Sequence, residues 1–246
     1  MAAVTEVSII IPVLNEGQTL ERTLRHLQIL EPPAREVLVV DGGSSDATVA
    51  IAEASGAVVL QAARGRAAQM NAGAQRAQGD YLCFLHGDTL VPDDLVAVIR
   101  ATLAERDVAC GGFISVMAGA HTTRWGITLH NSLKTHYAPL LFRPHRYFGN
   151  GLRLLFGDQV MFCRQRDFWA CGGFDAAMPI MEEADLCLKL CRRGRIRQVN
   201  RLVQSSDRRV ARWGPLKANG IYLGIGFLWG LGVPATTLKR FYQEVR

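Results

Sequence analysis

The chain has 246 residues, of which 49% are hydrophobic and 20% charged, a balance that excludes a disordered protein and suffices for one substantial core. The net charge of +6 favours a polyanionic partner, and it leaves a nucleotide diphosphate, an anionic membrane surface and nucleic acid open. The six cysteines show no C-x-x-C spacing and several lie in apolar segments, so reduced core thiols are favoured over zinc ligands or disulfides.

Short apolar runs alternate with helical patterns at the start of the chain. Val7 to Ile11 is predicted as a buried strand, and a helix with four leucines on one face follows it. Val37 to Val40 is the next strand, a helix from about Ala47 to Ser55 ends at Gly56, and Ala57 to Leu60 is the third strand. This order is typical of a doubly wound α/β fold, with a mostly parallel sheet flanked by helices.

The same alternation continues through the first half of the chain. A polar, Ala-rich helix opens at Arg64-Gly65-Arg66 and runs to Ala77, and the strand Tyr81 to His86 follows it. Pro92 is expected to start another helix, which leads into the apolar strand around Cys110 to Val116.

The second half of the chain is less regular. We expect a partly mobile loop from His121 to Tyr147, because Pro139 and Pro144 interrupt any long helix. Three further elements are predicted, namely a strand at Val160 to Cys163, a helix at Met181 to Cys191, and a short strand at Ile196 to Val199. An arginine cluster from Arg192 to Arg212 surrounds the last strand and fits a solvated face, and contacts with a diphosphate, an acceptor or a membrane are the alternatives.

The carboxyl-terminal segment Ala218 to Leu238 has no charged residue and carries glycines at four-residue spacing. A membrane span is one interpretation, but Asn219, Pro234 and the many glycines favour an apolar helical hairpin or an interfacial segment. Neither a repeat nor a linker divides the chain, so one domain over 1–246 is expected. The amino terminus has no basic n-region, which predicts a cytoplasmic protein that is peripheral at the inner face of the membrane if the apolar segment touches lipid.

Two strands of the predicted sheet end in carboxylates. Asp41 follows the Val37 strand and opens the turn Gly42 to Asp46, and Asp88 follows the Tyr81 strand through Gly87. Ligands of open α/β sheets bind at the carboxyl ends of strands, so both carboxylates are candidates for one binding rim. The alternative is an acidic turn that only caps the next helix.

Five segments together resemble family-2 glycosyltransferases of the GT-A fold. They are IPVLNE (Ile11 to Glu16), VVDGGSSDAT (Val39 to Thr48), GRAAQMNAGA (Gly65 to Ala74), GDYLCFLHGDT (Gly79 to Thr89) and EEADLCLKLCRRG (Glu182 to Gly194). Each pattern is weak alone, whereas five in this order are a strong signal. The chain is similar to the short, single-domain bacterial members of that family.

The resemblance implies an inverting enzyme that moves a sugar from a nucleotide diphosphate donor, expected to be UDP-linked, to a hydroxyl-bearing acceptor of unknown identity. It implies a nucleotide-sugar-binding half at 1–117 and an acceptor-side half at 118–246. In family members the carboxylate at the position of Asp41 binds the nucleobase, and the loop corresponding to Pro12, Val13 and Glu16 lines the nucleoside pocket. Arg66 is expected to reach the diphosphate.

The metal motif departs from the family pattern. Relatives end the fourth strand with Asp-x-Asp, where this chain has His86-Gly87-Asp88. The resemblance puts a divalent cation, Mn or Mg, on Asp88, and His86 and Gly87 beside the nucleotide. Because one carboxylate is replaced by an imidazole, tight magnesium binding is in doubt, and manganese suits the histidine better.

The catalytic base is also assigned through the resemblance. Relatives carry a Glu-Asp-x-Asp-Leu element at a helix start, and Glu182-Glu183-Ala184-Asp185-Leu186 matches it with Glu183 in place of the aspartate. Glu183 is therefore the expected base, with Glu182 as its rival. Adjacent helical residues point about 100° apart, so only one of the two can face a given site squarely.

Two other functions stay open. One is a catalytically silent nucleotide-sugar-binding protein, which is favoured if His86 abolishes metal binding, and the other is a membrane-surface enzyme that glycosylates a polyprenyl or lipid acceptor. Nucleic-acid binding is disfavoured, because aromatic residues are not interleaved with the arginine cluster as stacking platforms require.

Overall fold

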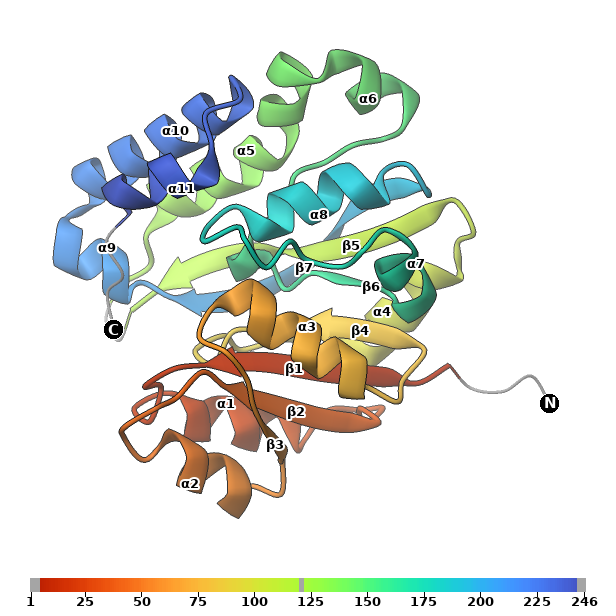
Figure 1. Ribbon diagram of the computed structural model, residues 1–246, viewed down its shortest axis with the longest axis vertical. Helices are drawn as coiled ribbons and strands as arrows, with labels where there is room; N and C mark the ends of the chain where they lie inside the picture. The colour runs from red at the N-terminus through yellow and green to blue at the C-terminus, as the bar shows by residue number, and fades with distance from the viewer. Residues whose placement is uncertain (1–4, 120–121, 243–246) are drawn as a thin grey trace.

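Strand β1 (Val7–Val13) lies inside the central sheet, and every one of its residues is buried. The computed structural model describes residues 5–119 and 122–242, and its sheet has the strand order β3-β2-β1-β4-β6-β5-β7 (Figure 1). The other strands are β2 (Glu36–Asp41), β3 (Val58–Gln61), β4 (Tyr81–Phe84), β5 (Val108–Ala118), β6 (Phe162–Arg164) and β7 (Arg195–Ser206). All pairings are parallel except those of β6, which is antiparallel to both β4 and β5.

Helices cover both faces of this sheet (Figure 1). In the first half they are α1 (Leu20–Leu27), α2 (Thr48–Ala54), α3 (Arg66–Arg76) and α4 (Leu95–Ala104). In the second half they are α5 (Trp125–Phe142), α6 (Pro144–Gly149), α7 (Gln165–Ala170), α8 (Glu182–Leu190), α9 (Arg208–Trp213), α10 (Pro215–Gly230) and α11 (Ala235–Leu238), with short 3₁₀ turns at η1 (Gly157–Gln159) and η2 (Lys239–Phe241).

Two hydrophobic cores lie on opposite faces of the sheet, because successive side chains of a strand point to opposite faces. Ile9 and Ile11 of β1 pack with the leucines of α1 and with α4. Ile10 packs with Met70 of α3 and with α8 on the other face. The predicted α/β class with a mostly parallel sheet is therefore confirmed, and the elements of the first half begin and end within a few residues of their predicted bounds.

The loop predicted from His121 to Tyr147 is wrong over the residues that are described, since α5 and α6 occupy most of them; His121 itself lies outside the described residues. Pro139 sits inside α5 and cannot donate to the carbonyl of Thr135, four residues earlier. The backbone N–H of Leu154 donates to that carbonyl instead. A hydrogen bond from a distant segment thus compensates for the proline, and local sequence gives no sign of it.

Strand β7 is longer than predicted. The sequence pattern favours only Ile196 to Val199, whereas the strand runs from Arg195 to Ser206 beside β5, with a register shift near Gly112. Its exposed arginines hide the strand from a hydropathy pattern, and its pairing with β5 places it at the edge of the sheet. As a result, the chain that follows Ser206 starts at the same end of the sheet as the chain that follows β1 and β4.

All six cysteines are free thiols; five are buried, and Cys171 is half-buried. The apolar segment from Ala218 onward lies in α10 and α11. Within residues 5–119 and 122–242, no helix combines the length and the apolar character that a bilayer crossing requires.

Candidate active site

A cavity of about 560 Å³ opens at the carboxyl ends of the parallel strands. The ends of β1, β4, β5 and β7 contribute Val13, Gly87, Met117 and Ser206 to its wall, and α5, α8, α9 and α10 contribute residues from the second half of the chain. Strand ends of this kind carry the binding sites of open α/β sheets.

The cavity brings together eight of the nine residues that the sequence predicted for the site. They are Pro12, Val13, Glu16, Arg66, His86, Gly87, Asp88 and Glu183. Asp41 is the exception and does not line the cavity.

The carboxylate of Asp41 is buried and is used inside its own turn. It accepts hydrogen bonds from the backbone N–H groups of Gly43 and Ser44 and from the Ser44 hydroxyl. The neighbouring Gln69 side chain donates to the carbonyls of Val13 and Val40 and so joins the ends of β1 and β2. The hydrogen bonds of Asp41 lie within the turn and do not cap α2, which begins at Thr48. A nucleobase contact of Asp41 stays a prediction.

Asp88 and Glu16 share an arginine that sequence reasoning did not select. The Nη2 atom of Arg208 lies 2.9 Å from Oδ2 of Asp88 and 2.7 Å from Oε2 of Glu16. Burial raises the pKa of Glu16, and the positive charge of Arg208 opposes that rise. The guanidinium is therefore shared by the two carboxylates that face this part of the cavity, and its single positive charge balances one of their two negative charges.

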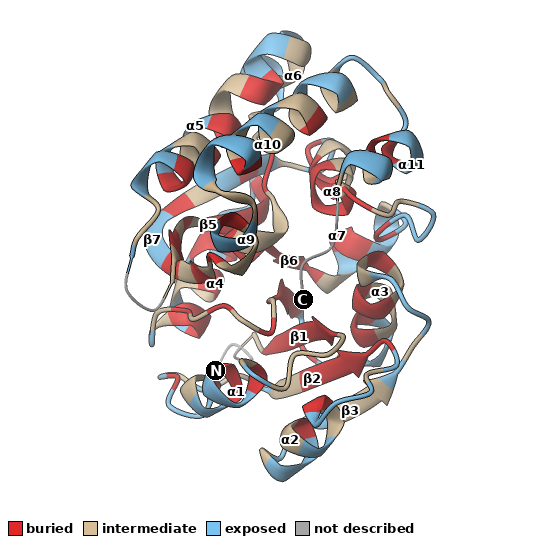
Figure 2. Cartoon of the chain, turned by 90° about the vertical axis from the view of Figure 1, so that its left-hand side faces the viewer, coloured by how far each residue is buried: buried red, intermediate tan, exposed pale blue. Residues whose placement is uncertain are grey.

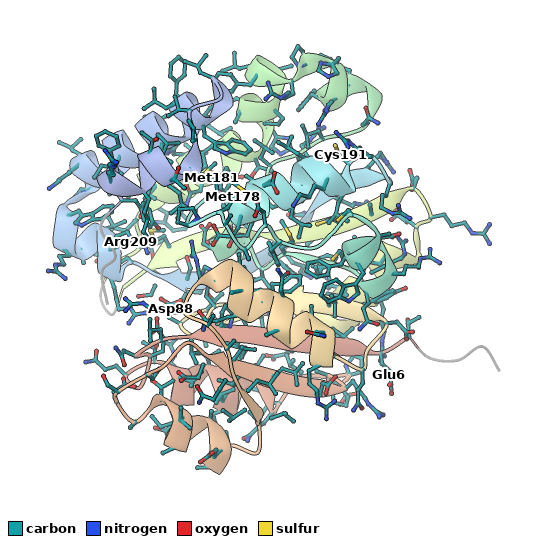
Figure 3. All side chains as sticks on the ribbon, viewed as in Figure 1. Glu6, Asp88, Met178, Met181, Cys191 and Arg209 are labelled. Carbon is teal, nitrogen blue, oxygen red and sulfur yellow. The ribbon has the colours of Figure 1, made fainter. Side chains whose placement is uncertain are left out.

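The fold explains why Arg208 reaches this position. Leu90, two residues after Asp88, exchanges backbone hydrogen bonds with Gln204 near the end of β7. This bridge holds the end of β7 against the loop that carries Asp88, and α9 begins at Arg208 directly afterwards. A prediction of the full length of β7 would have placed Arg208 at the same edge of the sheet as Asp88. The sequence analysis left a diphosphate contact open for the arginine cluster as a whole but did not single out Arg208. In Figure 3 the labelled residues Asp88 and Arg209 lie on the same side of the molecule.

The two adjacent glutamates at the start of α8 have different surroundings. Oε1 of Glu182 lies 2.9 Å from Nε of Arg66, so that carboxylate is part of an ion pair. Glu183 lines the cavity, and burial, followed by the negative charge of Glu182, raises its pKa to about 7. A carboxylate with such a pKa can exchange a proton near neutral pH. Glu182 therefore holds Arg66, whereas Glu183 is available to a bound molecule.

His86 lies beside Glu183, with 3.9 Å between its Nε2 atom and Oε1 of the glutamate. Burial, and secondly the positive charge of Arg66, lowers the pKa of His86 to about 4, so its imidazole is neutral at pH 7. Within the described residues, neither of these two atoms has a hydrogen-bond partner. Gly157 backs both side chains: a Cβ atom there would lie 2.5 Å from Oε1 of Glu183 and 2.6 Å from Nε2 of His86.

A buried lysine completes the wall on the side of the second half. The ammonium of Lys134 stands 3.7 Å from the centroid of the Phe156 ring, and burial lowers its pKa to about 8. Asn131, one turn earlier on α5, donates to the carboxylate of Asp158. The guanidinium of Arg209 lies over the Tyr242 ring, with 4.6 Å between its Cζ atom and the ring centroid.

The residues around Asp88 fit a divalent cation that is held jointly with a phosphate ligand. In the described part of the chain, no three His, Cys, Asp or Glu side chains converge to hold an ion by themselves. Magnesium, however, is commonly bound by one or two carboxylates together with substrate phosphates and water. Asp88 lines the cavity and now pairs with the cation Arg208, so a positive charge at this carboxylate is accommodated.

The family model described as Glycosyl transferase family 2 matches residues 8–168, which is more than half of the chain. The chain belongs to glycosyl transferase family 2. The matched range includes Asp41 and Asp88, whereas Glu183 and Arg208 lie beyond it.

Solved glycosyltransferases share the fold of this family member. A mannosyltransferase from Pyrobaculum calidifontis, in complex with GDP-Man and Mn²⁺, has a TM-score of 0.71 at 17% identity and covers 98% of this chain and 68% of its own. Glucosyl-3-phosphoglycerate synthase from Mycobacterium tuberculosis, in complex with Mn²⁺, UDP and phosphoglyceric acid, has a TM-score of 0.67 at 20% identity and covers 94% of this chain and 80% of its own. The same synthase is also solved with Mg²⁺ and UDP.

Among curated family members, a poly-beta-1,6-N-acetyl-D-glucosamine synthase of Staphylococcus epidermidis is 32% identical over 94 residues. That alignment covers 36% of this chain and 23% of the synthase, so the chain spans less than a quarter of the length of this relative.

Proposed function

We propose that this protein is an inverting glycosyltransferase that moves a sugar from a nucleotide diphosphate donor, a UDP-sugar, to a hydroxyl group of an acceptor. The observation that carries the proposal is the pair at the start of α8, where Glu182 is neutralised by Arg66 and Glu183 faces the cavity with a pKa near 7. A carboxylate of that kind suits a general base that works near neutral pH.

In this proposal the donor binds to residues 1–117. Pro12, Val13 and Glu16 line the nucleoside side of the cavity, and His86 and Gly87 lie beyond them. Asp88 would hold a divalent cation, Mn²⁺ or Mg²⁺, against the diphosphate oxygens, and that cation supplies charge neutralisation for the leaving group. Solved structures with the same fold contain these ions together with nucleotides, which supports the assignment.

Two arginines serve the same diphosphate. Arg208 stands at Asp88, and Arg66 lines the cavity from α3 while it pairs with Glu182. Asp41 is a nucleobase ligand in this proposal only if the turn Gly43 to Ser44 releases its carboxylate. The backbone carbonyls and amides of the Pro12 loop are the alternative contacts for the base.

The acceptor binds to residues 118–246 and meets Glu183 from the opposite side of the sugar. Glu183 takes the proton of the acceptor hydroxyl. At the same time, the acceptor oxygen forms a bond to the anomeric carbon of the sugar. The bond between that carbon and the diphosphate breaks, and its electron pair leaves on the diphosphate. Attack opposite to the leaving group inverts the anomeric centre.

Glu183→Gln tests this assignment, with Glu182→Gln as the matched variant one residue away. We expect Glu183→Gln to lower kcat by about 100-fold or more, with little change in UDP affinity. Glu182→Gln should act chiefly through Arg66, with a smaller loss of kcat. A larger loss for Glu182→Gln, in proteins that both bind UDP by calorimetry, would contradict the assignment of the base.

A donor-hydrolysis assay distinguishes a glycosyltransferase from a catalytically silent nucleotide-sugar-binding protein. A glycosyltransferase releases UDP slowly from its donor when water replaces the acceptor, and Glu183→Gln should lower that release. Tight UDP-sugar binding without any release over the range of acceptors and cations tested would favour the binding protein.

A further inference from the structure

Helices α5 and α10 carry most of the exposed apolar side chains of the second half. On α5 these are Trp125, Leu129, Leu133 and Leu140, which recur at helical spacing and form one stripe. On α10 they include Leu216, Leu223 and Phe227, which form a second stripe with Leu231 directly after the helix. Phe148 of α6 is 76% exposed and adds to the same region.

The two helices are neighbours, so the stripes belong to one surface. His130 of α5 hydrogen-bonds Asn219 of α10, and the rings of Phe142 and Phe227 meet edge to face at 5.6 Å. Figure 1 shows α5, α6 and α10 together at one end of the molecule, opposite α1, α2 and β3, and Figure 2 shows exposed positions along all three of them. We call this surface the α5–α10 face.

The net positive charge of the chain comes from the segments that contain these helices. Residues 108–157 and 208–243 contain no Asp or Glu, so all 22 acidic residues lie elsewhere. The same segments carry 11 of the 28 Lys and Arg residues. Lys217 of α10 and Arg240 of η2 are exposed. Lys134, Arg208 and Arg209 line the cavity, and Arg124 pairs with Asp207. The exposed Lys217 and Arg240 therefore carry the basic character of the face, to which neither segment adds an acidic side chain.

An apolar helical face rimmed by basic residues is what an interfacial helix presents to a membrane. Basic residues near a bilayer gain electrostatic attraction from anionic lipids. A protein partner would match the apolar stripes, but the absence of acidic residues from both segments specifically complements an anionic surface. We propose that the α5–α10 face binds an anionic lipid surface.

This docking would put the cavity close to the lipid. The inner sides of the same helices contribute Lys134 and Tyr222 to the cavity wall, while their outer sides form the α5–α10 face. Only the thickness of one helix layer separates the bound sugar from the membrane. The proposal does not depend on glycosyl transfer, and a silent nucleotide-binding protein would dock in the same way.

Vesicle co-sedimentation of the full chain tests the proposal. The probes are vesicles of phosphatidylcholine alone and vesicles in which part of the phosphatidylcholine is replaced by phosphatidylglycerol. We expect binding to the anionic vesicles only, and release as the salt concentration rises. Equal binding to both vesicle types, or binding to neither, overturns the proposal.

Paired variants locate the binding surface. Leu133→Glu with Leu223→Glu places two charges on the stripes, at positions 52% and 48% exposed, and should lower binding to anionic vesicles by about tenfold or more. The matched control is Ile29→Glu with Val58→Glu, at positions 63% and 39% exposed at the other end of the molecule, which makes the same change of net charge. An equal loss in the control overturns the proposal.

A second variant keeps the test independent of folding. Lys217→Glu with Arg240→Glu changes exposed charges without touching an apolar contact, and should lower binding to anionic vesicles by a similar factor. Unchanged binding in this variant contradicts the electrostatic part of the inference. Sedimentation velocity tests for a dimer. If the parent chain is a dimer that does not bind vesicles, and Leu133→Glu with Leu223→Glu makes it monomeric, the face binds a second copy of the chain instead.

Discussion

Glu182 and Glu183 are adjacent in the sequence, but it is the carboxylate of Glu182 that forms the ion pair with Arg66. Burial, and secondly the negative charge of Glu182, raises the pKa of Glu183 to about 7, and the positive charge of Arg66 opposes that rise. A general base must be ionised to accept a proton. We therefore expect kcat/KM to rise with pH through about 7 and to level off above it, measured with saturating cation at each pH. A profile that is flat between pH 5.5 and 8.5 would separate Glu183 from the proton transfer.

The same residue predicts a pH-dependent stability. Below its ordinary pKa of 4.5 the carboxyl is protonated in both the folded and the unfolded chain, and no charge is buried. Between pH 4.5 and about 7 the unfolded chain releases this proton while the folded chain keeps it, so stability falls over that range; above pH 7 the folded chain buries the carboxylate at a constant cost. Glu183→Gln removes this cost, and its Tm should exceed that of the parent chain at pH 8 by an amount equivalent to about 2 kcal/mol. The difference should vanish toward pH 4.5.

Glu182→Gln provides the opposite control in that experiment. Loss of its carboxylate leaves Arg66 without the ion pair at 2.9 Å, so the free energy of unfolding should fall at pH 8. Equal Tm shifts of the two variants in the same direction would show that their surroundings are not distinct.

Arg208 predicts a competition with divalent cations. Arg208→Ala leaves the carboxylates of Glu16 and Asp88 facing each other without the guanidinium between them. We expect the variant to be less stable than the parent chain in EDTA and to gain more from Mn²⁺, because the ion can neutralise the same two carboxylates. Thermal melts with and without Mn²⁺ measure this directly. Arg208→Lys keeps a positive charge and should behave like the parent, and an Mn²⁺ response identical in all three proteins would separate Arg208 from the cation.

The sequence predicted the position of a site residue best where a motif fixes its side chain near a strand end or a helix start, and the roles of these residues stay predictions. His86, Asp88 and Glu183 reach the cavity because β4 and α8 end and begin as predicted. Asp41 also follows a strand, but its turn satisfies the carboxylate internally through Gly43 and Ser44. Hydrogen bonds of a carboxylate within its own turn cannot be distinguished from ligand contacts by residue type alone.

At the scale of elements, the short turn η1 packs against the side chains of Glu183 and His86 and so fixes their positions. Gly157 packs against both Glu183 and His86, so Gly157→Ala forces a Cβ atom into contact with their side chains. We expect a decrease in kcat of about 10- to 100-fold, because the base moves away from the acceptor, with a loss of stability of about 1 to 3 kcal/mol. UDP affinity should change little. Turnover assays combined with denaturant melts measure both effects.

Gly149→Ala is the control for that substitution. Gly149 ends α6, and no atom lies within 4 Å of the position that its Cβ would take. Kinetics and stability should both stay close to those of the parent chain. A comparable loss in the two variants would point to a general sensitivity of these loops and not to the contact with Glu183.

The elements of the second half were harder to predict for a physical reason. In the first half, the buried strand β1 and the amphipathic helix α1 carry hydrophobic patterns that the local sequence reports. In α5, the carbonyl freed by Pro139 is satisfied by Leu154, and in β7 the exposed arginines are held by pairing with β5. Both compensations come from partners distant in the sequence, which hydropathy and propensity do not register.

At the scale of the whole molecule, the cavity exists only because the two halves of the chain meet. Its walls combine the strand ends of the first half with α8, α9 and α10 of the second. The chain order of strands and helices predicts the α/β class. The position of α5 against α10, and hence the union of their apolar stripes and the basic residues around them, follows from tertiary packing alone.

The buried cysteines allow local unfolding of the sheet to be measured by their chemical reactivity. Cys110 and Cys163 are partners across β5 and β6, and burial raises the pKa of both thiols. Because the thiolate is the reactive species, an alkylating reagent reacts with these residues only after the strands part. The rate of alkylation, followed by mass spectrometry, would therefore measure how often β5 and β6 separate and expose these thiols to solvent in the parent chain. Donor binding, which stabilises the folded chain, should lower the rate of alkylation.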